Sequence, residues 1–196
     1  MQVVNDFESR LEEFVIASYQ VLGREKDIDN VVQTVELLRK HTDDVEIITI
    51  AWLHGLLAWK PMLNKISDVF KNDAGVQNAI TIWLDLAKNF EGNYCDSGIA
   101  RSISRLKDSN RNKLSIILLA KRIIESKAIR AKEPIRKLPN ALGNLGVLWA
   151  IPRSIHKTLW TSLFNETVLD LQVRHFDTRV QQPVVKKPWW RRLLWL

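Results

Sequence analysis

Two consecutive helices are predicted from residues 29–59, DNVVQTVELLRKHTDDVEIITIAWLHGLLAW. The first half has apolar residues at near-helical spacing, namely Val31, Val32, Val35, Leu37 and Leu38. The second half, from Val45 to Leu56, is so rich in apolar residues that its helix should be buried on most sides. His54 lies within this second helix, and burying an imidazole without a partner costs about 1–3 kcal/mol. We therefore expect His54 to have a hydrogen-bonding partner or a metal.

Further helices are predicted on both sides of this pair. Apolar spacing favours helices at residues 3–22, 62–71, 75–90 and 111–131, with a proline-punctuated helical region at 133–176. In that region we expect Trp149, Leu159, Trp160, Leu163 and Phe164 to lie in the core. Residues 92–98 and 108–110 are predicted to be polar linkers. The sequence thus predicts one all-α domain at residues 1–177 and a separate tail at 178–196.

The composition is that of an ordinary folded protein. Of 196 residues, 46% are hydrophobic and 26% are charged. Cys95 is the only cysteine, which excludes an internal disulfide and favours a reducing compartment. The N-terminus lacks the pattern of a signal peptide, and no uncharged stretch is long enough to form a transmembrane helix. A cytoplasmic location is therefore expected, with peripheral membrane association as a further option.

Charge is distributed unevenly along the chain. Residues 1–50 contain 5 Lys or Arg against 11 Asp or Glu, whereas residues 101–137 contain 12 against 3. This asymmetry predicts an acidic pole and a basic pole, and a basic face would suit a guanine nucleotide, another polyanion or an acidic protein partner. The alternative is that these charges only solvate the helix surfaces.

The order of these segments resembles the HD hydrolase domain of the RelA/SpoT family, without the synthetase half. Active members remove pyrophosphate from (p)ppGpp with a Mn²⁺ ion. The resemblance covers roughly residues 10–165 and rests on four stretches: the helix that starts near Asn30, the Leu53-His54 end of the next helix, LLAKRIIE at 118–125, and NALGNLGVLWAI at 140–151. It implies an HD-domain-like helical bundle.

The residues that would bind the metal in active relatives are largely replaced. Asn30, 24 residues before His54, stands where the first metal-binding histidine is expected. The family His-Asp pair is His54-Gly55, its Glu-Asp pair is Ala58-Trp59, and its last metal-binding aspartate is Lys121. Only His54 remains, so we expect no catalytic residues and no cofactor.

The resemblance implies a former active site that could bind a ligand. Its lining would consist of Asn30, His54, Trp59, Lys121 and Arg122. Arg24 and Lys26, in the loop after the first helix, are weaker candidates for nucleotide contacts. Two of these residues have alternative roles, because Asn30 could simply cap a helix and Lys121 could extend to solvent. A metal site that joins His41 to His54 is not expected, since about 15–20 Å of helix would separate them.

The last residues, QQPVVKKPWWRRLLWL, change in character. Basic and aromatic residues of this kind lie at membrane interfaces or bind partners, although the segment could also fold back on its own domain. The residues concerned are Lys186, Lys187, Trp189, Trp190, Arg191, Arg192 and Trp195.

The leading interpretation is a catalytically inactive HD-type protein that binds a nucleotide or a protein partner. One alternative is a weak metal-dependent nucleotide pyrophosphohydrolase, for which Mn²⁺ would be the cofactor. The other is an adaptor that contacts a membrane or a partner through the C-terminal tail.

Overall fold

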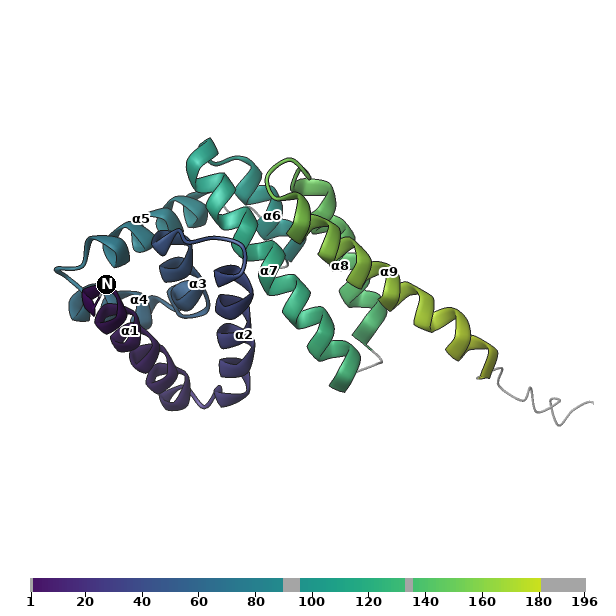
Figure 1. The fold of residues 1–196 in the computed structure, drawn as a ribbon, viewed down its shortest axis with the longest axis horizontal. Helices are drawn as coiled ribbons and strands as arrows, with labels where there is room; N and C mark the ends of the chain where they lie inside the picture. The colour runs from purple at the N-terminus through teal and green to yellow at the C-terminus, as the bar shows by residue number, and fades with distance from the viewer. Residues whose placement is uncertain (1, 90–95, 133–135, 181–196) are drawn as a thin grey trace, which may run out of the picture.

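The protein is all-α in the computed structural model, which describes residues 2–89, 96–132 and 136–180. Side chains are described for residues 6–89, 98–132 and 136–171. The described ranges form nine α-helices and one short 3-10 turn, and they contain no strand (Figure 1). The predicted all-α class is therefore confirmed.

The helices fall into two groups along the chain. The first group comprises α1 (Gln2–Val21), η1 (Glu25–Asp27), α2 (Ile28–Arg39), α3 (Val45–Leu57), α4 (Lys60–Val69) and α5 (Ala74–Lys88). The second comprises α6 (Asp96–Ser104), α7 (Asp108–Lys132), α8 (Lys137–Ala150) and α9 (Lys157–Val180). Helix α3 packs against α1, α2, α4, α5 and α7, while α7 packs against α2, α3, α6, α8 and α9. Figure 1 shows α7 at the side of the second group that faces the first.

Helix α3 is buried on most sides, as its composition predicts. Nine of its 13 residues are buried, and they include Trp52 and Leu53. Its first turn is capped by Asp44, whose carboxylate accepts hydrogen bonds from the backbone N–H groups of Glu46 (2.9 Å) and Ile47 (3.3 Å). Capping of this kind stabilises a helix by about 1 kcal/mol. The cap stabilises the start of α3, and its apolar surface packs against the other α-helices of the first group, so α3 lies at the centre of that group.

Several predicted helix boundaries were wrong. Helix α2 begins at Ile28 and has Asp27 at its N-cap position, so Asn30 lies inside the first turn and is not the cap. Helix α4 begins at Lys60, because Pro61 fits the first turn of a helix, where its missing N–H is not needed.

The two predicted linkers lie partly or wholly in helices. Residues 96–98 belong to α6, and residues 108–110 form the first turn of α7. Asp108 is well placed there, since an acidic side chain near a helix N-terminus interacts favourably with the helix dipole, and it also pairs with Arg111 at 2.7 Å. Helix α9 continues to Val180, beyond the predicted boundary at residue 177.

Polar side chains join α7, α8 and α9 in the interior. Arg122 donates from Nε to Asn144 Oδ1 (2.8 Å) and from Nη2 to Asn140 Oδ1 (2.6 Å). Asn140 in turn donates to Asp170 Oδ2 (3.1 Å), and Arg130 donates to Asp170 Oδ1 (2.8 Å). Because each of these polar groups has partners, their burial is compensated, and the network fixes which side of α8 faces inward.

Part of the predicted core is exposed instead. Leu159 and Leu163 are buried as expected, and Trp160 is partly buried. Trp149, however, is 94% exposed and Phe164 is 42% exposed. The interior side of α8 contains Asn140 and Asn144 instead, since these amides bond to the Arg122 guanidinium.

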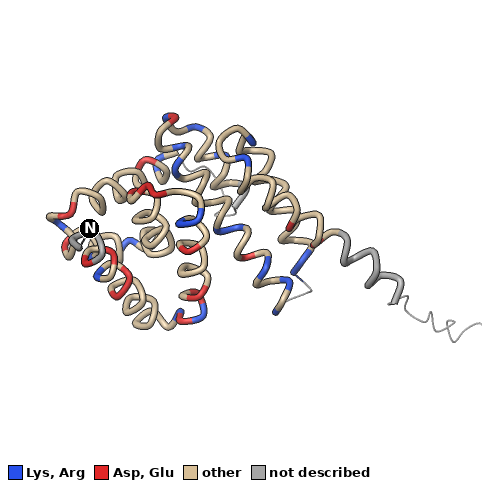
Figure 2. The backbone as a smooth tube through the Cα atoms, in the orientation of Figure 1, with Lys and Arg blue, Asp and Glu red and all other residues tan. Residues whose placement is uncertain are grey.

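Charged residues follow the predicted asymmetry. Figure 2 shows acidic residues concentrated along α1 and α2 and basic residues along α7. Some of the basic side chains form ion pairs, and Lys113 on α7 contacts Glu46 on α3 at 2.5 Å. Among the described helices, none combines the length and the apolar composition required to span a bilayer.

Candidate functional site

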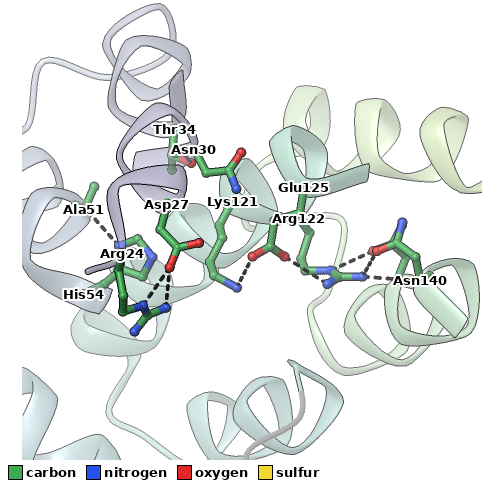
Figure 3. A network of polar contacts seen from close by, with 11 residues as sticks. Arg24, Asp27, Asn30, Thr34, Ala51, His54, Lys121, Arg122, Glu125 and Asn140 are labelled. Atoms are coloured by element: carbon green, nitrogen blue, oxygen red, sulfur yellow. Dashed lines mark hydrogen bonds and ion pairs between the residues drawn. The ribbon is translucent and has the colours of Figure 1, made fainter. Parts of the chain in front are cut away.

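A pocket of about 220 Å³ lies where α1, the η1–α2 segment, α3 and α7 meet. Its polar lining residues are Tyr19, Arg24, Asp27, Asn30, Thr34, His54, Lys121 and Glu125. Its apolar lining residues are Val31, Ala58, Trp83 and Ile99, and Gly55 completes the wall. Groups from distant parts of the chain thus converge on one small cavity, and Figure 3 shows several of them.

His54 has the partner that its position in an apolar helix requires. Its Nδ1 lies 2.7 Å from the carbonyl oxygen of Ala51, and because a carbonyl can only accept, Nδ1 holds the proton. Burial, and secondly the nearby Lys121 ammonium, lower the pKa of His54 from 6.5 to about 4. The imidazole is therefore neutral at pH 7, which leaves Nε2 as a hydrogen-bond acceptor.

Gly55 is required by the position of Tyr19. A Cβ atom at residue 55 would lie 2.0 Å from the Tyr19 hydroxyl oxygen and 3.3 Å from its Cζ. The Tyr19 side chain therefore occupies the space that any side chain at position 55 would need. A glycine inside an apolar helix usually has such a packing reason.

The Tyr19 hydroxyl is itself an unusual group. Tyr19 is 2% exposed and borders the pocket, and no described residue forms a hydrogen bond with its hydroxyl. Burial raises the pKa of Tyr19 to about 12, so the phenol stays protonated. A hydroxyl at a pocket wall that no described residue bonds is a group that a bound ligand could satisfy.

Two ion pairs contribute the charges of the pocket. Arg24 contacts Asp27 at 2.7 Å, and Lys121 contacts Glu125 at 2.7 Å (Figure 3). The two cations and two carboxylates balance, and His54 adds no charge. The Arg24 guanidinium also lies over the ring of Trp59, 5.4 Å from its centre. Arg24 is thus held in place at one side of the pocket while Lys121 stands at another.

The structure brings together only some of the residues predicted to form a site. Arg24, Asn30, His54 and Lys121 all line the pocket. Arg122 does not, since it is 5% exposed and points into the α7–α8 interface.

Trp59 and Lys26 also lie outside the lining. Trp59 is 41% exposed, and Lys26 is exposed as well. Trp59 reaches the pocket only indirectly, by stacking against Arg24. The tail residues Lys186, Lys187, Trp189, Trp190, Arg191, Arg192 and Trp195 lie outside the described residues.

Three further residues line the pocket that the sequence did not predict there, namely Asp27, Glu125 and Tyr19. Asp27 and Glu125 had a weak signal, because they follow Arg24 and Lys121 by three and four residues, spacings at which charged side chains pair in helical segments. Tyr19 had none, since nothing in α1 indicates that its side chain reaches Gly55. Outside the pocket, His41 and His156 lie with their ring centres 5.3 Å apart.

The pocket residues do not fit a Mn²⁺ ion. Mn²⁺ prefers several oxygen ligands, often carboxylates, arranged octahedrally. Here Asp27 and Glu125 are paired with cations, and the ammonium of Lys121 would repel a divalent ion at the wall it shares with His54. Among the described residues, no group of three or more His, Cys, Asp or Glu side chains could hold a metal.

A second pocket, of about 170 Å³, lies between α1 and α3. Its lining includes Phe7, Leu11 and Trp52, together with the paired side chains of Glu8 and Arg39. We favour the first pocket as the functional site, because it gathers polar groups from four segments of the chain.

Comparison with known proteins found no relative of this chain. Neither the family models, nor the curated proteins, nor the solved structures include a match to this chain.

Proposed function

We propose that this protein binds a guanine nucleotide in the pocket between α1, α2, α3 and α7 without hydrolysing it. The proposal combines the resemblance to HD-type (p)ppGpp hydrolases with the geometry of the pocket. In this reading the helical scaffold of the hydrolase is retained, while the chemistry of metal-dependent hydrolysis has been replaced.

One observation supports the proposal above the others. Asn30, His54, Gly55 and Lys121 stand at the positions where the resemblance expects metal-binding residues, and all four line the same pocket. The missing carboxylate at position 55 is replaced by the Tyr19 hydroxyl, which fills that space. The site is therefore closed to the family's metal and still open to a ligand.

The size of the pocket limits what can enter it. Pockets for drug-sized ligands measure about 300–1,000 Å³, so a cavity of about 220 Å³ admits one ring system and not a whole nucleotide. Guanine presents N–H donors and a carbonyl acceptor on one edge. The carboxylates of Asp27 and Glu125 could accept from those donors, while Asn30 and the Tyr19 hydroxyl can both donate and accept.

The phosphates would then lie outside the cavity, near Arg24. Its side chain is 37% exposed, and its planar guanidinium suits a phosphate oxygen pair. Lys121, which is 27% exposed, is the second cation available to the ligand. Because each cation already pairs with a carboxylate, binding would exchange partners rather than satisfy an unpaired charge.

The test is a thermal-shift series with (p)ppGpp, GTP, GDP and ATP, each with and without Mn²⁺. A ligand at about 100 times its dissociation constant adds roughly 2.7 kcal/mol, which is a shift of several degrees in melting temperature for a domain of this size. We expect guanine nucleotides to produce this shift whether or not Mn²⁺ is present, with no release of pyrophosphate.

A pair of lysine variants on α7 identifies the site. Lys121→Met should weaken binding by about tenfold or more, because it removes a charged hydrogen-bond donor from the pocket. Lys127→Met is the matched control, since Lys127 is exposed on the same helix and does not line the pocket. Equal affinities of the two variants, or a shift that needs Mn²⁺ and is accompanied by pyrophosphate release, would refute the proposal.

A further inference from the structure

Helix α8 presents a row of apolar side chains to solvent. The half-buried Leu138 and the exposed Leu142, Leu145 and Trp149 follow one another at spacings of four, three and four residues, which places them on one side of the helix. We call these four residues the α8 stripe. Leu142 is 57% exposed and Trp149 is 94% exposed. Large apolar side chains gathered in this way mark a surface that contacts something else.

The opposite side of α8 is the one that the fold uses. Asn140, Ala141, Asn144, Val147 and Leu148 are buried on that side, and α8 packs against α6, α7 and α9. The hydrogen bonds of Asn140 and Asn144 to Arg122 hold the helix in this orientation. The α8 stripe therefore cannot turn inward without breaking the interior network.

The exposed charged residues at the ends of α8 are all basic. Exposed cations stand at both ends, with Arg136 at the start of α8 and with Arg153 and Lys157 after its end. The only acids between residues 136 and 171 are Glu166 and Asp170. Their side chains are 15% and 0% exposed and both pair with Arg130, so the surface of this segment presents cations and no free carboxylate.

We propose that the α8 stripe docks on an anionic lipid surface. Apolar side chains with a tryptophan would insert at the level of the headgroups, and the flanking cations would contact lipid phosphates. This surface is separate from the nucleotide pocket, and it does not depend on the C-terminal tail. Figure 1 shows α8 and α9 at the side of the molecule away from α1, where a membrane could approach them.

A second copy of this chain is a poorer occupant. Symmetric pairing of two α8 helices would place cations against cations, whether Arg136 met Arg153 of the other copy or each residue met its own equivalent. With no exposed carboxylate in the segment to offset this, the repulsion would oppose association. An anionic lipid surface has the opposite charge and requires no matching groove.

The test is co-sedimentation of the full-length protein with vesicles. We expect binding to vesicles of phosphatidylcholine with phosphatidylserine, weaker binding to phosphatidylcholine alone, and a fall in binding as salt is added. The double variant Leu142→Ser with Trp149→Ser should lose about tenfold or more in affinity, because it removes the two most exposed side chains of the stripe. Val21→Ser is the matched control, since Val21 is 81% exposed on α1.

Two further measurements distinguish the stripe from the tail and from a dimer interface. The first uses a tail variant, Trp189→Ala with Trp190→Ala and Trp195→Ala. It should still bind anionic vesicles, and adding Leu142→Ser and Trp149→Ser to it should still weaken that binding. The proposal is overturned if only the tail variant loses binding, or if the natural chain does not bind anionic vesicles. The second compares the melting temperature and the oligomeric state of the natural chain and the stripe variant. The proposal is also overturned if the stripe variant melts at a lower temperature, because the chain itself would then cover the stripe. It is equally overturned if the natural chain is a dimer and the stripe variant is a monomer, because a second copy would then cover the stripe.

Discussion

Replacement of Gly55 by alanine should reveal the contact between α3 and Tyr19. In a helix interior, glycine to alanine normally stabilises by about 1 kcal/mol. Here the new Cβ would lie 2.0 Å from the Tyr19 hydroxyl oxygen, far inside van der Waals contact. Overpacking of this kind costs about 1–3 kcal/mol. We therefore expect the net effect in the natural chain to be destabilising, by up to about 2 kcal/mol.

The effect should reverse when the hydroxyl is removed. In Tyr19→Phe the nearest atom is the ring Cζ, at 3.3 Å, which a small shift of the ring can accommodate. Gly55→Ala should then be neutral or stabilising, so the interaction energy between the two sites should exceed about 1 kcal/mol. Tyr19→Phe alone should cost little, because no described residue bonds to the hydroxyl.

Urea unfolding of the four proteins in this cycle measures each free energy of unfolding. The decisive quantity is the difference between the effect of Gly55→Ala in the natural chain and its effect in the Tyr19→Phe variant. If alanine at position 55 stabilises both proteins equally, then the Tyr19 hydroxyl does not occupy this space and the account of the closed metal site fails.

Two further predictions concern buried polar groups. Because the pKa of His54 is lowered to about 4, the unfolded chain takes up the proton first as the pH falls, so stability decreases between pH 6.5 and about 4. At about 1.36 kcal/mol per pKa unit, the loss of unfolding free energy reaches about 3 kcal/mol. Urea unfolding across this pH range should show the loss, and His54→Gln should make the free energy of unfolding depend less steeply on pH. The same pH dependence in the His54→Gln variant would contradict the lowered pKa of His54. Asp170→Asn should cost about 2–3 kcal/mol, since Asp170 is fully buried and bonds to Arg130 and Asn140. Asp85→Asn, at a surface ion pair with Lys88, is its control, and an equally small effect at both positions would show that the interior network contributes little.

The interior network between α7, α8 and α9 also explains why Arg122 does not face the pocket. Its guanidinium donates hydrogen bonds to Glu125, Asn140 and Asn144. The sequence placed Arg122 next to Lys121 and suggested a shared role. Neighbours in a helix point about 100° apart, however, so Lys121 faces the pocket while Arg122 faces α8.

The sequence by itself determined the helical class and the position of the central helix. The unbroken apolar composition of Val45–Leu57 can be satisfied only by burial on most sides, and the structure buries it in this way. It also determined that His54 needs a partner, because an unpaired imidazole in such a helix is costly. These properties depend on local composition and spacing, which are visible in one dimension.

Only the tertiary structure decided which surfaces meet. Helix α8 has apolar residues on two sides, and periodicity cannot tell which side is interior; the hydrogen bonds of Asn140 and Asn144 to Arg122 decide it and leave Trp149 in solvent. The contact between Tyr19 and Gly55 likewise joins residues 36 positions apart through the shapes of two side chains. Such contacts depend on packing between helices, for which the spacing of residues along one helix gives no signal.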